Sequence, residues 1–324
     1  KAEMQMCISS YKFPVTRHLW MTVLGALAVT VAGTQPVPLF EDLALDGGFR
    51  LSAVSSTQKP VESGVVLAAE PAIPAVWRLA QWGTKFSLEG AKEEDDDSGA
   101  RRLCNIAKEV IVYPGGLSGE GILLAVTGAS EYGDILRKQG EPWPHLLIEQ
   151  QLPAIPVSRY KEMRFQVKFR VDRCTPATAE PMDPGLHTAQ VTAFWTVHNQ
   201  NPESKNFKDM IWFGLPLFDV RYPVPPGHQA VDIGKNDATG KFICTIPGDR
   251  LYRKPVEIGA WNTLACDLVP LIREALEASH GKGFLTETVC SDLALTSFNL
   301  GWEVPGSYNC SIRLQSLYFN GTDG

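Results

Sequence analysis

The side chains best suited to hold a hydroxyl-rich ligand lie at alternate positions in the middle of this chain. Polar and apolar residues alternate in segment 163–172 (MRFQVKFRVD) and again in segment 187–199 (HTAQVTAFWTVHN). Amide, imidazole and cationic groups at this spacing form one polar face, and nearby aromatic rings offer flat apolar surfaces, a combination that suits a sugar. The candidate binding residues are Trp143, His145, Gln166, Lys168, Arg170, Gln190, Trp195 and His198.

Three carboxylates lie close to tryptophan in the sequence and are candidates for acid–base chemistry. Glu149 lies in WPHLLIEQ, Asp219 in WFGLPLFDVR and Glu303 in GWEVPG. Glycoside hydrolysis requires two carboxyl groups about 5 to 9.5 Å apart, whereas elimination next to a uronate requires a base and a neutralising cation. The candidate catalytic residues are Glu149, His198 and Asp219, although structural hydrogen bonds to turns explain the carboxylates equally well.

The same alternation identifies the elements that must position these residues. In 163–172 the apolar residues Phe165, Val167, Phe169 and Val171 share one parity, which is the period of a half-buried β-strand. Segment 211–221 (IWFGLPLFDVR) is the third such strand. We expect an all-β protein, an antiparallel β-sandwich of jelly-roll type, in which the three strands turn their polar sides toward one shared trough. The alternative is a polar sheet face that only meets water.

Two further features refine this fold. In the closing segment 311–319 the apolar parity slips between Leu314 and Leu317, which predicts a β-bulge. Segment 270–280 (PLIREALEASH) has helical spacing, with Asp267 placed to cap its start and Gly281 its end. Trp195 and His198 fall on opposite parities, so both can serve one ligand only if a bulge lies between them.

Composition indicates a globular protein that does not bind nucleic acid. The chain has 324 residues, of which 44% are hydrophobic and 20% charged, and its 28 Gly and 23 Pro are typical of many short strands joined by turns. Its net charge of −6 excludes the basic stripe that phosphates would require. No Gly-, Pro- or Ser-rich linker divides it, so residues 37–320 are expected to form a single domain.

The first 33 residues have the pattern of a secretory signal. Lys12 and Arg17 precede an apolar stretch from Leu19 to Ala32, and small residues follow. A stretch of about 14 apolar residues is shorter than the roughly 20 that span a bilayer, so a signal peptide is favoured over a membrane anchor. We therefore expect a secreted or extracytoplasmic protein without a further membrane segment.

Cysteine usage is compatible with export but does not identify a disulfide framework. Cys7 belongs to the predicted signal, which leaves Cys104, Cys174, Cys244, Cys266, Cys290 and Cys310. Six cysteines permit up to three disulfides, but buried free thiols are almost as good an explanation in a chain of this size.

Metal and cofactor motifs are weak. A calcium site is conceivable at the acidic run 93–97 or in the turn 232–240 (DIGKNDATG), but a solvated hairpin tip and an ordinary loop are favoured for them. Sequences typical of a nucleophile elbow, a phosphate-binding loop or a zinc protease are absent. We expect no cofactor and no metal.

Several segments together resemble secreted jelly-roll proteins of the concanavalin-like kind. These are the signal-like start, WPHLLIEQ, HTAQVTAFWTVHN, WFGLPLFDVR and the closing FNLGWEVPG (residues 298–306). That group includes carbohydrate-binding modules, polysaccharide lyases and glucanases, so the resemblance implies a β-sandwich that acts on or binds polysaccharide. The acidic E-x-D-x-x-E motif of the glucanases is missing, and no catalytic residue is transferred.

The sequence thus favours an exported protein that binds a glycan or polysaccharide on its polar sheet face. A polysaccharide lyase or glycoside hydrolase on the same scaffold is the first alternative, and a structural or adhesive surface protein is the second.

Overall fold

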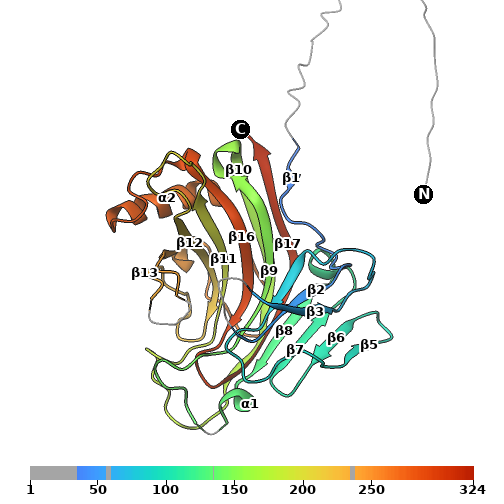
Figure 1. The fold of residues 1–324 in the computed structure, drawn as a ribbon. Helices are drawn as coiled ribbons and strands as arrows, with labels where there is room; N and C mark the ends of the chain where they lie inside the picture. The colour runs from blue at the N-terminus through green and yellow to red at the C-terminus, as the bar shows by residue number, and fades with distance from the viewer. Residues whose placement is uncertain (1–34, 56–59, 134, 234–237) are drawn as a thin grey trace, which may run out of the picture. The chain divides into compact units, whose positions relative to one another are not determined.

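The computed structural model describes residues 35–55, 60–133, 135–233 and 238–324. The predicted signal segment and Cys7 lie outside the described residues. Residues Gln35–Gly324 form one compact unit that contains two large β-sheets (Figure 1). Among the described residues, no helix has both the length and the apolar character needed to cross a bilayer.

The first sheet, called sheet A, contains eight of the described strands. In spatial order they are β15 (Asn262–Asp267), β10 (Tyr160–Pro176), β17 (Tyr308–Asp323), β8 (Ile122–Thr127), β7 (Lys108–Val112), β6 (Arg101–Cys104) and β5 (Glu93–Asp95), with β1 (Val37–Pro38) paired to β17. All of its neighbouring strands are antiparallel. The acidic run 93–97 forms part of the β5–β6 hairpin, where Glu94 pairs with Arg102.

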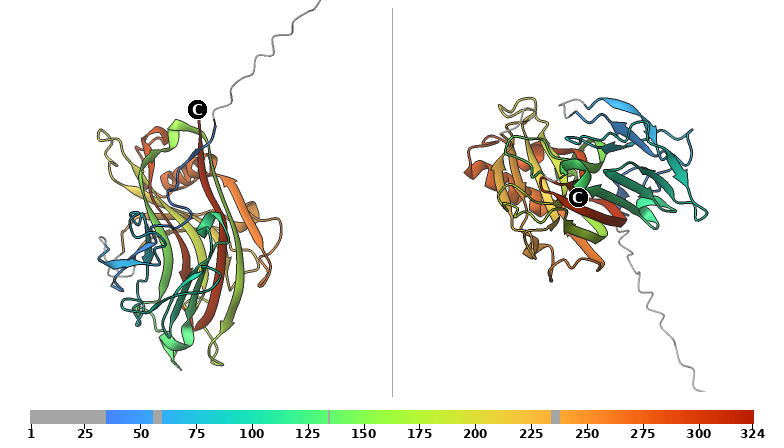
Figure 2. Two further views of the ribbon diagram at one scale, coloured as in Figure 1. Left: turned by 90° about the vertical axis from the view of Figure 1, so that its right-hand side faces the viewer. Right: turned by 90° about the horizontal axis from the view of Figure 1, so that it is seen from below.

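The second sheet, called sheet B, contains nine of the described strands. In spatial order they are β13 (His228–Val231), β14 (Phe242–Thr245), β12 (Met210–Asp219), β11 (Gln190–Asn199), β16 (Leu293–Glu303), β9 (His145–Pro156), β4 (Trp77–Ala80), β2 (Phe49–Ser52) and β3 (Glu62–Val66). Only the β12–β14 and β2–β4 pairs of this sheet are parallel. Figure 2 shows the N-terminal strands, blue to teal, gathered on one side of the unit and the strands near α2 on the other.

Helices are few among the described residues. The α-helices are α1 (Gly128–Tyr132) and α2 (Leu268–Gly281), and the short 3₁₀ turns are η1 (Gly116–Ser118), η2 (Val157–Arg159), η3 (Gly248–Arg250) and η4 (Cys290–Asp292). The carboxylate of Asp267 accepts a hydrogen bond from the backbone N–H of Val269 at 3.1 Å, so the predicted N-cap of α2 is confirmed. The apolar side of α2 joins the core through Leu271, Ile272 and Leu276.

The two sheets pack face to face over one apolar core, which confirms the predicted all-β sandwich. Phe165 of sheet A lies edge-on against Trp195 of sheet B, with ring centroids 4.8 Å apart. Phe165, Val167, Phe169 and Val171 are all fully buried, as their parity predicts. Burial of these apolar and aromatic side chains is the largest favourable contribution to the folding free energy.

The predicted bulge near the C-terminus is also confirmed. Gln166 pairs with Tyr318 and Lys168 with Gln315, so β17 advances by three residues over a stretch where β10 advances by two. Ser316 takes the extra position with φ of 50°, a left-handed conformation. Leu314 and Leu317 therefore both reach the core, and Gln315 and Tyr318 both stay on the outside.

The expectation of one shared trough is wrong. β10 belongs to sheet A, where it pairs with β15 and β17, whereas β11 and β12 belong to sheet B. The inner sides of both sheets meet in the core, so their polar sides point away from each other. Alternation shows which residues of a strand face the core, but it does not show which sheet the strand joins.

Candidate functional site

A polar group on the outside of sheet B forms a row across three neighbouring strands. Gln190 of β11, Glu303 of β16 and His145 of β9 are direct partners in the sheet register, which places their side chains on one face. The Gln190 side-chain amide donates to Glu303 Oε2 at 3.3 Å, and His145 Nε2 lies 3.9 Å from the same oxygen. This group, called the Glu303 row, contains two residues of the predicted binding set.

Water reaches the Glu303 row. The His145 side chain is 15% exposed and the Glu303 side chain 24%, so the carboxylate is open to a ligand. His145 Nδ1 donates to the Trp143 carbonyl at 3.0 Å, because a carbonyl oxygen only accepts. That contact fixes the ring so that Nε2 is the nitrogen turned toward Glu303.

Tryptophans border the Glu303 row. Trp143 stacks on His145 with ring centroids 5.7 Å apart and planes at 27°, and Trp82 meets the same imidazole edge-on at 6.1 Å. The Arg137 guanidinium lies 5.1 Å from the Trp143 ring centroid. Trp143 therefore lies at the predicted site, where its ring also orients His145.

Glu149 lies on the same face but is held in a chain of ion pairs. Its carboxylate is 3.1 Å from Arg78, Arg78 is 3.2 Å from Glu62, and Glu62 is 2.9 Å from Arg50. Burial raises the pKa of Glu149 from 4.5 to about 7, and the nearby Arg78 charge opposes this rise only in part. A carboxylate that is buried and paired with Arg78 in this way fits a structural role.

The register also separates Glu149 from Glu303. Glu149 pairs with Asn299, four residues from Glu303 along β16. Four residues of strand and one strand spacing place the two α-carbons about 14 Å apart. The Glu149 carboxylate is paired with Arg78, which also pairs with Glu62, so no contact among the described residues links it to Glu303.

Asp219 lies opposite Gln190 on β12, but its oxygens are already occupied. Arg221 forms an ion pair with it at 2.6 Å, and the Thr188 hydroxyl donates to it at 2.9 Å. Only 8% of the Asp219 side chain is exposed. These contacts hold the end of β12 in place and leave little of the carboxylate for a substrate.

His198 lies at the other end of β11, about 27 Å along the strand from Gln190. Its Nδ1 is 2.7 Å from the Thr296 hydroxyl, which is itself 2.7 Å from that of Thr196. Burial lowers the pKa of His198, and the Lys241 charge acts in the same direction against the opposing Asp209. His198 and the Glu303 row therefore belong to the same face but not to the same cluster.

Two aromatic residues on this face were missed by the sequence reasoning. Phe194 projects from β11 on the parity of Gln190, and Trp212 projects from β12 with its ring 6.3 Å from that of Phe194. The Phe194 ring lies over Gly214, where an added Cβ would come within 2.5 Å of it. The sequence did hold an indication, because Phe194 occupies a position of the alternating pattern at which the neighbouring side chains are polar and face outward.

Trp195 is not a stacking residue. It is fully buried in the sandwich, with its ring 4.9 Å from Phe298 and 4.8 Å from Phe165. The register shift between Thr196 and Val197 takes its extra residue from β16, while β11 runs in continuous register with β12, so Trp195 keeps its inward parity. Its prediction as a ligand contact is therefore corrected.

The remaining predicted binding residues lie on the opposite side of the unit. Gln166, Lys168 and Arg170 project from β10 on the outside of sheet A. Lys168 and Arg170 lie against Trp261, a residue that the sequence reasoning did not select. The structure therefore divides the predicted set into two groups on two faces.

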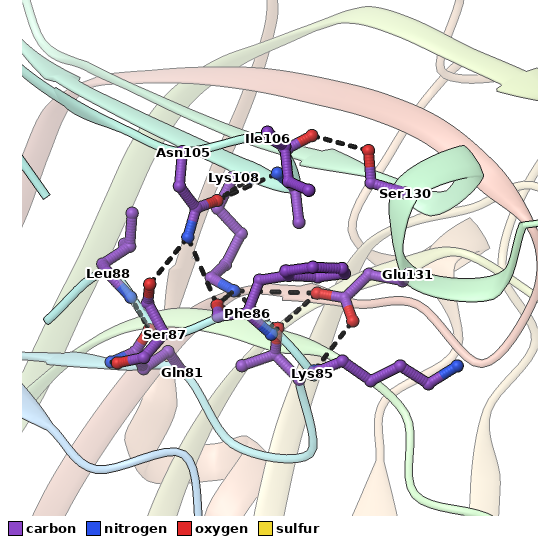
Figure 3. A network of polar contacts seen from close by, with 12 residues as sticks. Gln81, Lys85, Phe86, Ser87, Leu88, Asn105, Ile106, Lys108, Ser130 and Glu131 are labelled. Atoms are coloured by element: carbon purple, nitrogen blue, oxygen red, sulfur yellow. Dashed lines mark hydrogen bonds and ion pairs between the residues drawn. The ribbon is translucent and has the colours of Figure 1, made fainter.

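A buried charged cluster lies away from both faces (Figure 3). Lys108 of β7 is 3.6 Å from Glu131 of α1, and its ammonium donates to the Thr84 hydroxyl at 2.5 Å. Both side chains are almost inaccessible to water. Burial lowers the pKa of Lys108 from 10.5 to about 8, against the opposing effect of Glu131. The cluster ties together β7, α1 and the loop after β4.

Two hollows of the described residues lie away from the Glu303 row, since none of its residues lines either of them. A hollow of about 430 Å³ lies between β14 and α2, with Arg250, Glu274 and Ala278 in its lining. Another of about 370 Å³ lies near Pro71 and Ile73. In the described part of the chain, no group of three or more His, Cys, Asp or Glu side chains is arranged to hold a metal ion. The described cysteines are all free thiols.

No protein-family model matches this chain, and no curated protein matches it. Among solved structures, a family 12 xyloglucanase from Bacillus licheniformis is 9% identical, with 71% of this chain and 96% of that one covered and a TM-score of 0.38. Endoglucanase 3 of family GH12 from Trichoderma harzianum is also 9% identical, with 76% and 98% covered and a TM-score of 0.37. A variant of the Cel12A cellulase of Rhodothermus marinus is 12% identical, with 71% and 95% covered and a TM-score of 0.36. Similarities of this size carry no argument about activity, so the function must be inferred from the site.

Proposed function

We propose that this is an exported protein that binds a neutral glycan on the outside of sheet B, centred on the Glu303 row. The observation that carries the proposal is the alignment of an amide, a carboxylate and an imidazole across three adjacent strands, beside two tryptophans. Sugar hydroxyls both donate and accept hydrogen bonds, and the three groups of the row supply both functions. The apolar faces of sugar rings suit indole surfaces.

The charge of this face favours a neutral ligand over an acidic one. Arg78 and Arg50 are already paired with Glu149 and Glu62, so they offer no free cation. Glu303, in contrast, is partly exposed and would repel a carboxylate placed against it. A polymer of uncharged sugars satisfies the row without this repulsion.

Binding is favoured over hydrolysis because of the carboxylate arrangement. Glu149 is paired with Arg78, and Asp219 is held by Arg221 and Thr188, so neither carboxylate is free to act with Glu303. Cleavage by a lyase or hydrolase remains the alternative hypothesis. It predicts new reducing ends or an unsaturated product, which a pure binding protein does not produce.

The test is affinity electrophoresis of the chain through gels that contain neutral polysaccharides, namely glucans, xylans and mannans. We expect at least one polymer to retard the protein. Glu303→Gln removes a charge-assisted acceptor and is expected to weaken binding about tenfold, and Gln190→Ala to weaken it several-fold. Glu203→Gln, which makes the same charge change in an exposed turn beyond the far end of β11, is the matched control.

Two outcomes would remove the basis of the proposal. One is that no neutral polymer retards the wild-type protein. The other is that Glu303→Gln and Gln190→Ala behave like Glu203→Gln while all three retain the wild-type unfolding profile. Release of reducing ends in the same incubations would favour the catalytic alternative.

A further inference from the structure

The outside of sheet A carries a second, differently charged surface. Its centre is Trp261, which immediately precedes β15 and is 37% exposed. Around it lie Lys168, Arg170 and Asp172 of β10 and Arg313 of β17. These five residues are called the Trp261 cluster.

Two cations are held against the indole of Trp261. Lys168 Nζ lies 4.9 Å from the ring centroid, and the Arg170 guanidinium carbon lies 5.0 Å from it. Both project from β10 two residues apart, so the ring spans them. Cation–π contacts of this kind restrict the long side chains and thereby reduce the ordering cost when an anion binds.

The cluster has an excess of positive charge in a chain whose net charge is −6. Asp172 pairs with Arg170 and lies 3.6 Å from Arg313, so one carboxylate serves two guanidinium groups. Among the ion pairs of the described residues, none involves Lys168. A local surplus of cations, with one ammonium uncompensated, is suited to a ligand that carries negative charge.

The groups beside these cations match a sugar rather than a bare anion. Gln166 and Gln315 present amides on the same face, and Tyr318 is 37% exposed beside them. The bulge at Ser316 is what places Gln315 and Tyr318 together on the outside. On the other flank, Arg313 donates to the Tyr113 hydroxyl at 2.6 Å, which fixes its guanidinium.

We propose that the Trp261 cluster is a second binding site that takes an anionic polysaccharide, with a sugar carboxylate on the Lys168 ammonium and a ring face on Trp261. The site is separate from the Glu303 row, because the outer sides of the two sheets of a sandwich point away from each other. The protein then holds an acidic polymer on one face and a neutral one on the other.

The test measures binding of the full chain to immobilised polygalacturonate and to the same polymer after its carboxyl groups have been reduced to neutral alcohols. Trp261→Ala is expected to weaken binding to polygalacturonate about tenfold. Lys168→Gln is expected to weaken it about threefold. Lys161→Gln is the matched control, since Lys161 is an exposed lysine on the same strand, outside the cluster. Glu303→Gln should leave this binding unchanged, which separates the second site from the first.

The result that supports the site is strong binding to polygalacturonate, weak binding to the reduced polymer and loss of affinity in Trp261→Ala and Lys168→Gln only. Equal weakening by Lys168→Gln and Lys161→Gln would overturn it, because attraction would then come from overall charge. Equal binding of the reduced polymer, or equally strong binding of single-stranded DNA, would also overturn it. If Trp261→Ala does not fold, the comparison of Lys168→Gln with Lys161→Gln decides.

Discussion

Replacement of Glu149 by Gln tests whether this carboxylate is a buried structural group. Because burial raises its pKa from 4.5 to about 7, the folded protein keeps a proton on Glu149 that the unfolded chain loses. A raised carboxyl pKa means that stability is highest at low pH and falls as the pH rises from about 4.5 to about 7. Glu149→Gln removes this dependence, since an amide does not titrate.

The expected magnitude follows from the same two pKa values. At about 1.4 kcal/mol for each pH unit between them, the carboxylate costs about 3 kcal/mol of unfolding free energy above pH 7. The side chain is only 10% exposed, so solvent screening reduces this figure little. The unfolding free energy of wild type minus that of Glu149→Gln should therefore fall by about 2 to 3 kcal/mol between pH 4.5 and pH 7.5, and then stay level.

The assay is urea denaturation of both proteins at several pH values, with Glu203→Gln as the control for a generic loss of negative charge. The reasoning is refuted if the difference is flat with pH, or if it rises with pH. A rise would mean that Arg78 stabilises the charged carboxylate more than burial disfavours it. Neutral-glycan binding should change less than twofold in Glu149→Gln, which a ligand-contacting role would not allow.

The remaining predictions concern the buried groups. Lys108→Met leaves the Glu131 carboxylate buried without its cation and should cost about 3 kcal/mol of unfolding free energy. The double variant with Glu131→Gln should recover most of that loss. Urea denaturation measures both losses, and equal losses in the two variants would contradict the pairing. Because burial lowers the Lys108 pKa from 10.5 to about 8, the folded protein bears the full cost of its buried charge below about pH 8 and none of it above about pH 10.5. The wild-type advantage over Lys108→Met should therefore be larger at pH 10.5 than at pH 8, and urea denaturation at both pH values checks this. Cys174 and Cys310 are direct partners on β10 and β17, at the α-carbon spacing of about 4.5 to 5.5 Å that a disulfide accepts. Because burial shields both thiols and raises their pKa in the folded protein, refolding from urea with oxidised glutathione should link this pair before any other, and peptide mapping that finds a different first disulfide would show the prediction to be wrong. Trp195→Ala should lose about 3 to 5 kcal/mol as a core truncation, whereas a conservative Trp195→Phe that folds should bind glycan like wild type in affinity electrophoresis.

The strand alternation alone predicted much of this fold. The parity of 163–172 identified four core residues of β10, and the slip between Leu314 and Leu317 located the bulge in β17. The cap of α2 was recognisable because Asp267 precedes a helical apolar pattern. Each of these features is local, since it depends on residues only a few positions apart.

Sheet membership was not accessible in the same way. β10 pairs with β17, which begins more than 130 residues later, and its alternation is equally compatible with either sheet. The residues predicted to line one trough therefore lie on two separate faces, although Gln190 and His145 do lie together around Glu303. Trp261 was missed because it becomes part of a surface only through the pairing of β15 with β10.

The central claim is that neutral glycan lies on the Glu303 row, and amide hydrogen exchange of the full chain with and without a retarding neutral oligosaccharide tests it most directly. The account predicts slower exchange in the segments that carry the row and its borders, residues 142–146, 187–191 and 302–306, with no change in β10, β15 or Trp261. Protection confined to sheet A, or absent from all three segments when the ligand is saturating, would contradict it.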